Sequence, residues 1–340
     1  MLSIEQRLQH IGDLAKWGVV TYDFEGILER HYRRWVRPGA TVVDIGAHAG
    51  RHLKPLLQCV GASGTAIGFE PIPSVFDNLR TQLEGSGAVL VNAALSDSIG
   101  TAEFVFAQGC PEESGLRQRV YNMPDRAQPT IIHVRVDTLD NYAREFGRLD
   151  FVKIDVEGGE IGCLKGAQET IARLRPLISV EYGFPSYSAY GHTKQTLFDL
   201  AASYGYVLYD IFLNRLAQQD DWLAACDALC WDYIMVPIEK EAEFVARMLQ
   251  PPPDTFIEAR LASEQETTAR LRVANAELEA RAKSLEERAK SQEERAATAE
   301  RQLVVQTARA DELANRNDAL LNSTSWRVTA PLRLVSKIVR

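Results

Sequence analysis

The chain has 340 residues and a net charge of −8 at neutral pH, with 46% hydrophobic and 25% charged residues. This composition excludes a wholly disordered chain, a collagen and a multi-span membrane protein. The acidic balance disfavours nucleic acid as a partner. Five cysteines without a CxxC spacing indicate neither a zinc site nor a disulfide framework. We therefore expect a cytoplasmic protein of about two domains.

The first 37 residues are predicted to form a helical segment, and residues 38–250 show the pattern of one α/β domain. Short β-rich apolar runs alternate there with helix-length segments, which is typical of buried strands in a doubly wound, mostly parallel sheet. The seven runs are TVVDIG (41–46), TAIGFE (65–70), AVLVNAA (88–94), LDFVKID (149–155), PLISVEY (176–182), YVLYDI (206–211) and WDYIMVP (231–237). The helices expected between them include Ser74–Leu83, Gly159–Leu174 and Lys194–Tyr204.

A long segment separates the third run from the fourth. Within it, TAEFVF (101–106) and IIHVRV (131–136) predict an inserted pair of strands that flank a loop with Gly and Pro residues. A long loop inside a compact domain is more often functional than idle, so we expect this insert to contribute to a site.

Residues 254–322 follow three consecutive prolines, contain no Gly or Pro, and carry 14 acidic and 11 basic side chains. One heptad register places apolar residues at 13 of 19 a and d positions, which predicts a long α-helical coiled coil. Several of these residues are alanine, so weak pairing is expected. Asn275 and Asn317 at a positions favour a parallel homodimer. The alternative is a solvated single helix held by charge pairs four residues apart.

The ends of the first two runs carry a cofactor signal. A D-x-G-A-x-x-G pattern runs from Asp44 to Gly50, and a parallel strand that enters a glycine turn offers a cofactor cleft at its carboxyl end. Glu70, 24 residues after Gly46, is placed to accept hydrogen bonds from both hydroxyls of a ribose. An acid before the turn suits an ammonium and hydroxyls better than a pyrophosphate. Together these acids indicate S-adenosylmethionine.

The segments VVDIGAHAG (42–50), GFEP (68–71), VNAALSD (91–97) and above all LDFVKIDVEGGE (149–160) resemble the FkbM family of S-adenosylmethionine-dependent methyltransferases. The resemblance covers about residues 38–238. It implies a class I methyltransferase fold, which is a Rossmann-like, mostly parallel seven-stranded sheet, and O-methylation, often of sugar or polyketide hydroxyls. The cofactor-binding residues that it implies are Asp44, Gly46, Ala47, Gly50, Glu70, Asn92 and Ala93.

Lys153, Asp155 and Glu157 surround the end of the fourth run, at the edge that in class I methyltransferases faces methyl donor and acceptor. A methyl group on a sulfonium is already reactive, so the protein mainly supplies in-line positioning and proton removal. Asp155 is the first catalytic candidate, as a base or an acceptor anchor, and Glu157 is the second. The alternative is that both side chains cap the turn and the following helix.

Three further residues offer alternatives for the chemistry. Glu181 ends the fifth run, and a divalent metal shared by the Asp155 and Glu181 carboxylates is possible but not favoured. Direct binding of an acceptor hydroxyl by the same pair is the other interpretation. His48 and His192 are less favoured candidates for the base.

The last segment, residues 323–340, carries four basic and no acidic side chains among apolar residues that include Trp326. Such a basic amphipathic tail suits the anionic surface of the inner membrane. Its STSWRVTAPLR stretch is similar to tails on bacterial enzymes of surface-polysaccharide synthesis, mostly glycosyltransferases. Docking onto a polysaccharide-synthesis protein is the competing interpretation. We expect a cytoplasmic protein that attaches peripherally to the membrane through this tail.

The sequence therefore predicts an S-adenosylmethionine-dependent O-methyltransferase that acts on a sugar hydroxyl of a glycan or glycolipid acceptor, in bacterial surface polysaccharide biosynthesis of the O-antigen or lipopolysaccharide type. The alternative is a non-catalytic coiled-coil scaffold that recruits polysaccharide-synthesis enzymes to the membrane. Intact acids and glycines at the expected strand ends argue against the scaffold. A nicotinamide-dependent oxidoreductase is disfavoured by the missing G-x-G-x-x-G pattern.

Overall fold

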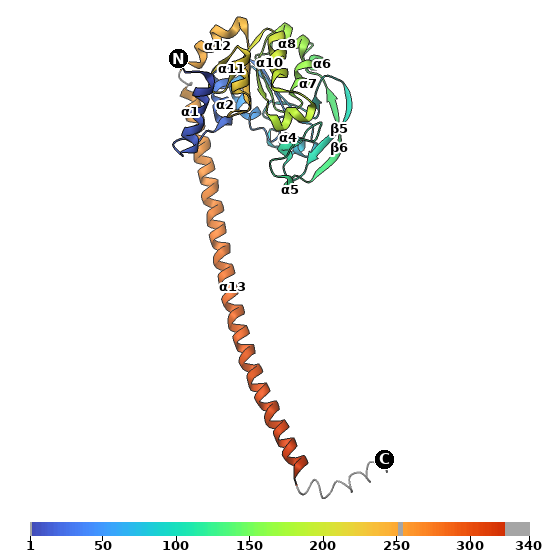
Figure 1. The fold of residues 1–340 in the computed structure, drawn as a ribbon, viewed down its shortest axis with the longest axis vertical. Helices are drawn as coiled ribbons and strands as arrows, with labels where there is room; N and C mark the ends of the chain where they lie inside the picture. Colours follow the sequence, from blue (N-terminus) through green and yellow to red (C-terminus); the bar gives the residue numbers. More distant parts are fainter. Residues whose placement is uncertain (1, 251–253, 324–340) are drawn as a thin grey trace. The chain divides into compact units, whose positions relative to one another are not determined.

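The structure is a computed structural model that describes residues 2–250 and 254–323 (Figure 1). The chain divides at Ile257 into two compact units, an α/β body and a C-terminal unit. The main sheet of the body contains, in spatial order, β10 (Arg215–Leu216), β9 (Tyr206–Asp210), β11 (Asp232–Pro237), β8 (Leu177–Glu181), β7 (Phe151–Ile154), β1 (Thr41–Ile45), β2 (Thr65–Phe69) and β3 (Val89–Val91).

This sheet confirms the predicted mostly parallel α/β fold. Strands β3, β2, β1, β7 and β8 are parallel neighbours, and β11 runs antiparallel between β8 and β9. The predicted count of seven strands is wrong, because the sheet has eight. The extra strand is the two-residue β10, which returns antiparallel to β9 after a tight turn. The Asp210 carboxylate holds that turn by accepting hydrogen bonds from the amides of Phe212 and Asn214, both at 2.9 Å.

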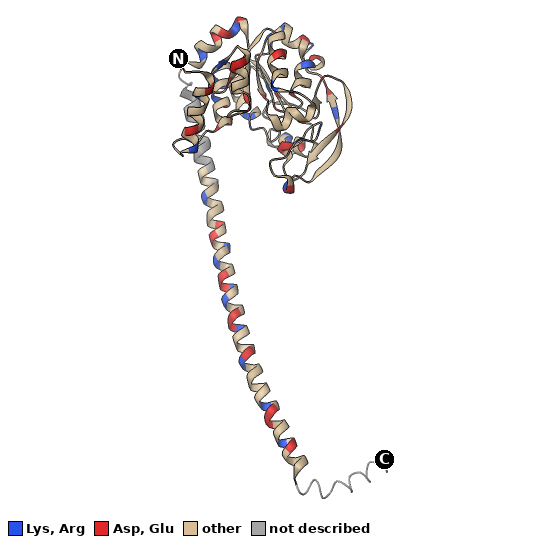
Figure 2. Cartoon of the chain, viewed as in Figure 1, with Lys and Arg blue, Asp and Glu red and all other residues tan. Residues whose placement is uncertain are grey.

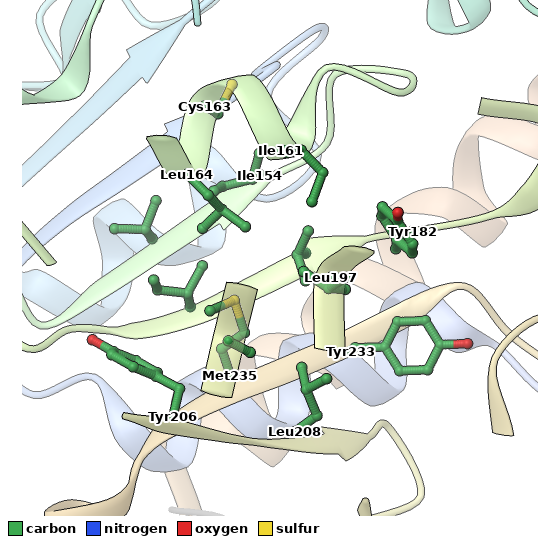
Figure 3. Close-up of a cluster of buried hydrophobic side chains, with 14 of the residues drawn as sticks. Ile154, Ile161, Cys163, Leu164, Tyr182, Leu197, Tyr206, Leu208, Tyr233 and Met235 are labelled. Carbon is green, nitrogen blue, oxygen red and sulfur yellow. The ribbon is translucent and has the colours of Figure 1, made fainter. Parts of the chain in front are cut away.

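Alternate residues of the strands pack on opposite faces of the sheet, as the two-residue period of a strand requires. On β1, Val43 and Ile45 belong to one buried cluster and Val42 to the other. The first cluster contains Ile154, Leu164, Leu197, Tyr206, Leu208 and Met235, which Figure 3 draws around the strands. Because both faces are covered, only the ends of the strands remain available for a site.

Helices cover the two faces. Those that contribute to the first cluster are α1 (Ile4–Lys16), α6 (Leu139–Tyr142), α7 (Glu160–Lys165), α8 (Gln168–Leu174), α9 (Phe184–Tyr187), α10 (Lys194–Ser203) and α11 (Gln219–Ala225). Those that contribute to the second are α2 (Phe24–Trp35), α3 (Leu53–Val60), α4 (Pro73–Gln82) and α12 (Glu241–Met248). Helix α5 (Pro124–Ala127) lies in the insert.

Two expected elements are divided. The predicted run 88–94 is not one strand, because the chain leaves β3 at Asn92, whose side-chain amide donates to the carbonyl oxygens of Glu70 and Pro71 at 2.8 and 3.1 Å. The predicted helix 159–174 is also interrupted, between α7 and α8. A Cβ added at Gly166 would lie 1.9 Å from the Ser96 carbonyl oxygen, so the helix meets another segment at its break.

The predicted insert forms a second sheet with the order β4 (Ala94–Leu95), β6 (Pro129–Asp137) and β5 (Gly100–Ala107). Strands β5 and β6 pair antiparallel along their length, and Figure 1 shows them as a curved ribbon. Residues 108–128 connect the two strands, and we call this connection the insert loop. It has a small buried cluster of its own, formed by Ala107, Cys110 and Ala127 with Tyr121 packed against it.

The C-terminal unit contains α13 (Asp254–Asn322), a helix of 69 residues. Acidic and basic side chains are interspersed along it (Figure 2). Its described leucines are exposed. The coiled coil stays a prediction. None of the described helices is long and apolar enough to span a membrane. The predicted basic tail lies outside the described residues, apart from Ser323.

Candidate functional site

A cavity of about 290 Å³ opens at the carboxyl ends of β1, β2, β7 and β8, where parallel sheets of this class bind ligands. Most of the residues proposed from the sequence line it together. They are Asp44, Gly46, Ala47, Glu70, Ala93, Asp155 and Glu157. Gly50, Asn92 and His192 are not among the lining residues, whereas His48 and Glu181 are. The strand-end acids predict a site at the carboxyl edge of the sheet, and the structure has a cavity there.

Gly46 shapes the floor of the cavity. Its φ of +84° lies in the left-handed region, and a Cβ at this position would lie only 1.8 Å from the carbonyl oxygen of Asp155. The ends of β1 and β7 therefore lie so close together that no residue with a Cβ atom fits at position 46. His48, two residues later, also has a left-handed φ of +44°, so this turn is strained beyond what glycine alone explains.

Glu70 is fixed by the turn that follows β1. Its carboxylate accepts hydrogen bonds from the backbone amides of His48 and Ile72, at 2.9 and 2.8 Å. Burial raises the pKa of Glu70 to about 7, although these two hydrogen bonds oppose the shift. Each carboxylate oxygen retains a lone pair, so Glu70 still has the capacity to accept the two ribose hydroxyls. Asn92, by contrast, supports the backbone at Glu70 rather than the cavity wall.

Asp44 is a buried acid of the cavity whose hydrogen bonding is incomplete. Its side chain is 1% exposed, it lines the cavity, and its Oδ1 atom has no hydrogen-bond partner within the described structure. Burial raises its pKa, and the nearby Lys153 ammonium acts in the opposite direction. A buried carboxylate oxygen without a partner costs free energy, so this atom is a candidate contact for a ligand donor.

Asp155 belongs to a buried network of charges. Lys153 donates a hydrogen bond to Asp155 Oδ2 at 2.7 Å, and Asp155 also hydrogen-bonds Glu181 on the next strand. Burial would raise the pKa of Asp155, but Lys153 and the hydrogen bond from Glu181 lower it. The Asp155 charge, followed by burial, raises the pKa of Glu181 well above its ordinary range. When this pair holds one proton, the proton is therefore on Glu181 and Asp155 is ionised.

Glu157, the second catalytic candidate, lines the cavity but is already engaged. It has a left-handed φ of +58°, and its Oε2 accepts hydrogen bonds from Arg119 and, at 3.0 Å, from Ser186 Oγ. Arg119 comes from the insert loop and its side chain is buried. The insert loop also supplies Pro111, Glu112, Ser114 and Leu116 to the cavity wall. The insert loop therefore forms part of the cavity wall.

Glu160, at the start of α7, provides a pH-dependent contribution to stability. Its Oε1 accepts hydrogen bonds from the amides of Val156 and Gly158, and burial raises its pKa from 4.5 to about 7. A carboxyl group with a raised folded-state pKa favours folding while it is protonated. That contribution is complete below pH 4.5 and is lost as the pH rises towards 7.

The wild type is expected to lose unfolding free energy between pH 5 and pH 7.5 as Glu160 ionises. We therefore expect this loss to be smaller in Glu160→Gln, by up to about 3 kcal/mol. Glutamine keeps an acceptor oxygen for both amides and does not ionise. Urea denaturation at the two pH values measures the effect, with the exposed Glu169→Gln as control. An equal pH dependence in wild type and Glu160→Gln would show that Glu160 does not titrate as described.

Two residues that the sequence did not suggest also line the cavity. Glu25 lies in the first turn of α2, and its Oε2 accepts a hydrogen bond from Nε2 of the buried His52. The Tyr32 hydroxyl lies 3.3 Å from His52 Nδ1, so the imidazole has a partner on each nitrogen. No local pattern marks Glu25, because its partner is 27 residues away in the chain.

No group of three or more His, Cys, Asp or Glu side chains in residues 2–250 and 254–323 has an arrangement that would hold a metal ion. Cys226 and Cys230 are free thiols and are buried.

Comparison with known proteins finds a family model that matches much of the segment around this cavity. Residues 44–208 match the model of the methyltransferase FkbM domain. No curated protein matches the sequence. Among solved structures, the chain is similar to the methyltransferase FkbM of Methylobacillus flagellatus, with 15% identity and a TM-score of 0.36 over 68% of this chain. The match spans 58% of the Methylobacillus chain, which is less than two thirds of its length.

Two further similarities are of the same kind. An S-adenosylmethionine-dependent methyltransferase of Aquifex aeolicus shows 12% identity and a TM-score of 0.33, over 68% of this chain and 98% of that one. Fibrillarin of Aeropyrum pernix, solved with natively bound S-adenosyl-L-methionine, shows 13% identity and a TM-score of 0.34, over 61% of this chain and 73% of that one.

Proposed function

We propose that this protein, whose residues 44–208 match the model of the methyltransferase FkbM domain, transfers a methyl group from S-adenosylmethionine to a hydroxyl group. The observation that carries the proposal is the buried, unpartnered Asp44 oxygen in a cavity that Glu70 also lines. These two acids stand at the ends of β1 and β2, where one would meet the amino-acid part of the cofactor and the other its ribose.

The charge of the cavity supports this choice of cofactor. Seven acidic side chains line it, of which Glu181 holds a proton, and only Lys153 and Arg51 among the lining residues carry a permanent positive charge. Lys153 is paired with Asp155, and Arg51 with Glu29 at 2.6 Å. A ligand with a sulfonium and an ammonium gains from such surroundings, whereas the pyrophosphate of a dinucleotide is repelled.

Asp155 is the residue that we propose to accept the hydroxyl proton. S-adenosylmethionine supplies a methyl group that is already activated by its bond to a sulfonium. The remaining requirement is a base at the acceptor oxygen, and Asp155 is ionised, partly exposed and at the cavity wall. Lys153 keeps it ionised, so Lys153 is a positioning residue. Acceptor hydroxyls in a sugar, as in a surface polysaccharide, would be bound from the side of Glu157 and the insert loop.

Calorimetric titration of the purified chain with S-adenosylhomocysteine, with NAD as control, tests the cofactor assignment. Micromolar binding of S-adenosylhomocysteine alone supports it. Binding of NAD instead would contradict it, and binding of neither would favour the coiled-coil scaffold that recruits polysaccharide-synthesis enzymes.

We also propose that the protein is a homodimer through α13, and that the basic tail attaches it to the inner-membrane surface or to a polysaccharide-synthesis protein. The dimer proposal rests on the heptad pattern and on the exposure of the d-position leucines, which is 62% at Leu271 and 63% at Leu278. An apolar stripe of this kind gains free energy by pairing with a second copy.

The double variant Leu271→Glu, Leu278→Glu is expected to shift the protein from dimer to monomer in sedimentation velocity, because it places like charges in the seam. Val273→Glu is the matched control, since Val273 is equally exposed at 61% but lies at an f position outside the seam. A wild-type protein that sediments as a monomer at tens of micromolar would remove the dimer proposal.

A further inference from the structure

We propose that Glu25 binds the ammonium group of S-adenosylmethionine together with Asp44, so that helix α2 is part of the cofactor site. This inference rests on the proposed function. Glu25 lies 19 positions before the first residue of the family match, so the match itself assigns it no role. It lines the same cavity as Asp44, and its side chain is about half exposed.

The Glu25 carboxylate is held in place. His52 Nε2 donates to one of its oxygens, and His52 is itself buried and hydrogen-bonded to Tyr32. This hydrogen bond is the largest cause of a lowered pKa at Glu25, so the carboxylate is ionised at neutral pH. The other carboxylate oxygen, Oε1, is available to a ligand on the cavity side.

Helix α2 has a second attachment to the segment after β1, through Glu29, which lies one helical turn after Glu25. Glu29 accepts a hydrogen bond from Arg51 at 2.6 Å and from Arg33 at 2.8 Å. Arg51 and His52 are adjacent in the chain, and Glu25 and Glu29 are on the same face of the helix. The two pairs therefore set both the position and the rotation of α2 over the cavity.

The balance of charges indicates a cation as the partner of Glu25. Lys153 is ion-paired with Asp155, and Arg51 is ion-paired with Glu29. The Glu25 charge raises the pKa of Asp44, which shows that the two carboxylates lie close enough to repel each other. Two neighbouring acids with neither a lysine nor an arginine bonded to them, one of them buried with an unpartnered oxygen, are what an ammonium ligand neutralises.

The test compares S-adenosylhomocysteine with its deaminated analogue, which keeps the carboxylate and the adenosine but lacks the ammonium. Glu25→Gln retains an acceptor oxygen for His52, so α2 stays attached while the charge is lost. Glu29→Gln is the matched control, because it alters the other attachment of α2 and does not line the cavity. Both variants and the wild type are titrated calorimetrically as full-length chains.

We expect Glu25→Gln to weaken S-adenosylhomocysteine binding about tenfold or more and to leave binding of the deaminated analogue unchanged. Glu29→Gln should keep the wild-type ratio of the two affinities. Equal weakening of both ligands by Glu25→Gln would overturn the proposal and assign Glu25 only to holding α2. Unchanged binding of both would overturn it as well. If the wild type bound neither ligand, the proposed function would fail first.

Discussion

Replacing Asp155 by asparagine is expected to lower methyl transfer about 10²–10⁴-fold, the range that general-base catalysis contributes. Asparagine has nearly the same shape but accepts no proton. It still accepts the hydrogen bond from Lys153, so the end of β7 keeps its geometry. S-adenosylhomocysteine binding should therefore change little. Turnover measured with saturating cofactor, alongside calorimetric affinity, separates the two effects.

Glu157→Gln is the matched control, since it removes the same charge two residues away. We expect a much smaller loss, because Arg119 and Ser186 tie the Glu157 carboxylate to the insert loop and to α9, so we assign it to the cavity wall and not to proton transfer. Full activity in Asp155→Asn with a large loss in Glu157→Gln would reverse the assignment and make Glu157 the base.

Gly46→Ala is expected to destabilise the body by about 3 kcal/mol or more, from left-handed strain and overpacking together. The added methyl group would overlap the Asp155 carbonyl oxygen, from which it would be only 1.8 Å away. Because a backbone atom is in the way, β1 and β7 must separate, and cofactor binding should weaken at least about a hundredfold. Urea denaturation and calorimetric titration measure the two effects.

Gly87→Ala isolates the cost of the backbone conformation. Gly87 has the same φ of +84°, but nothing lies within 4 Å of its added Cβ. This variant should lose only about 1–2 kcal/mol of stability and bind S-adenosylhomocysteine normally. If the two variants lost equal stability, close approach of the strands would not be the reason for glycine at position 46.

Sequence reasoning located the strand ends because their signals are local. A buried strand followed by a turn is visible in consecutive residues, so Asp44, Glu70 and Asp155 were placed at the right edge of the sheet. Short strands are less visible, and β10 was missed because two residues carry no periodic pattern. The break between α7 and α8 depends on contact with Ser96, which no propensity predicts.

The hydrogen-bonded residue pairs around the cavity could not be predicted from the sequence, for a related reason. Glu25 meets His52, and Arg119 meets Glu157, across 27 and 38 residues of chain. Such contacts exist only once α2 and the insert loop have packed, and charged residues on a helix or loop usually face solvent. The raised pKa of Glu181 could not be predicted from the sequence either, since it is caused by the ionised Asp155 on the neighbouring strand.

The position of β11 has a consequence for synthesis of the chain. This strand lies between β8 and β9 in space, yet it follows both in sequence. Until residues 232–237 have left the ribosome, β8 and β9 expose unpaired edges, which are the places where strands from other chains attach. The nascent body is therefore vulnerable to aggregation until its last strand arrives, and Asp232 reaches its place opposite Glu181 only at that moment.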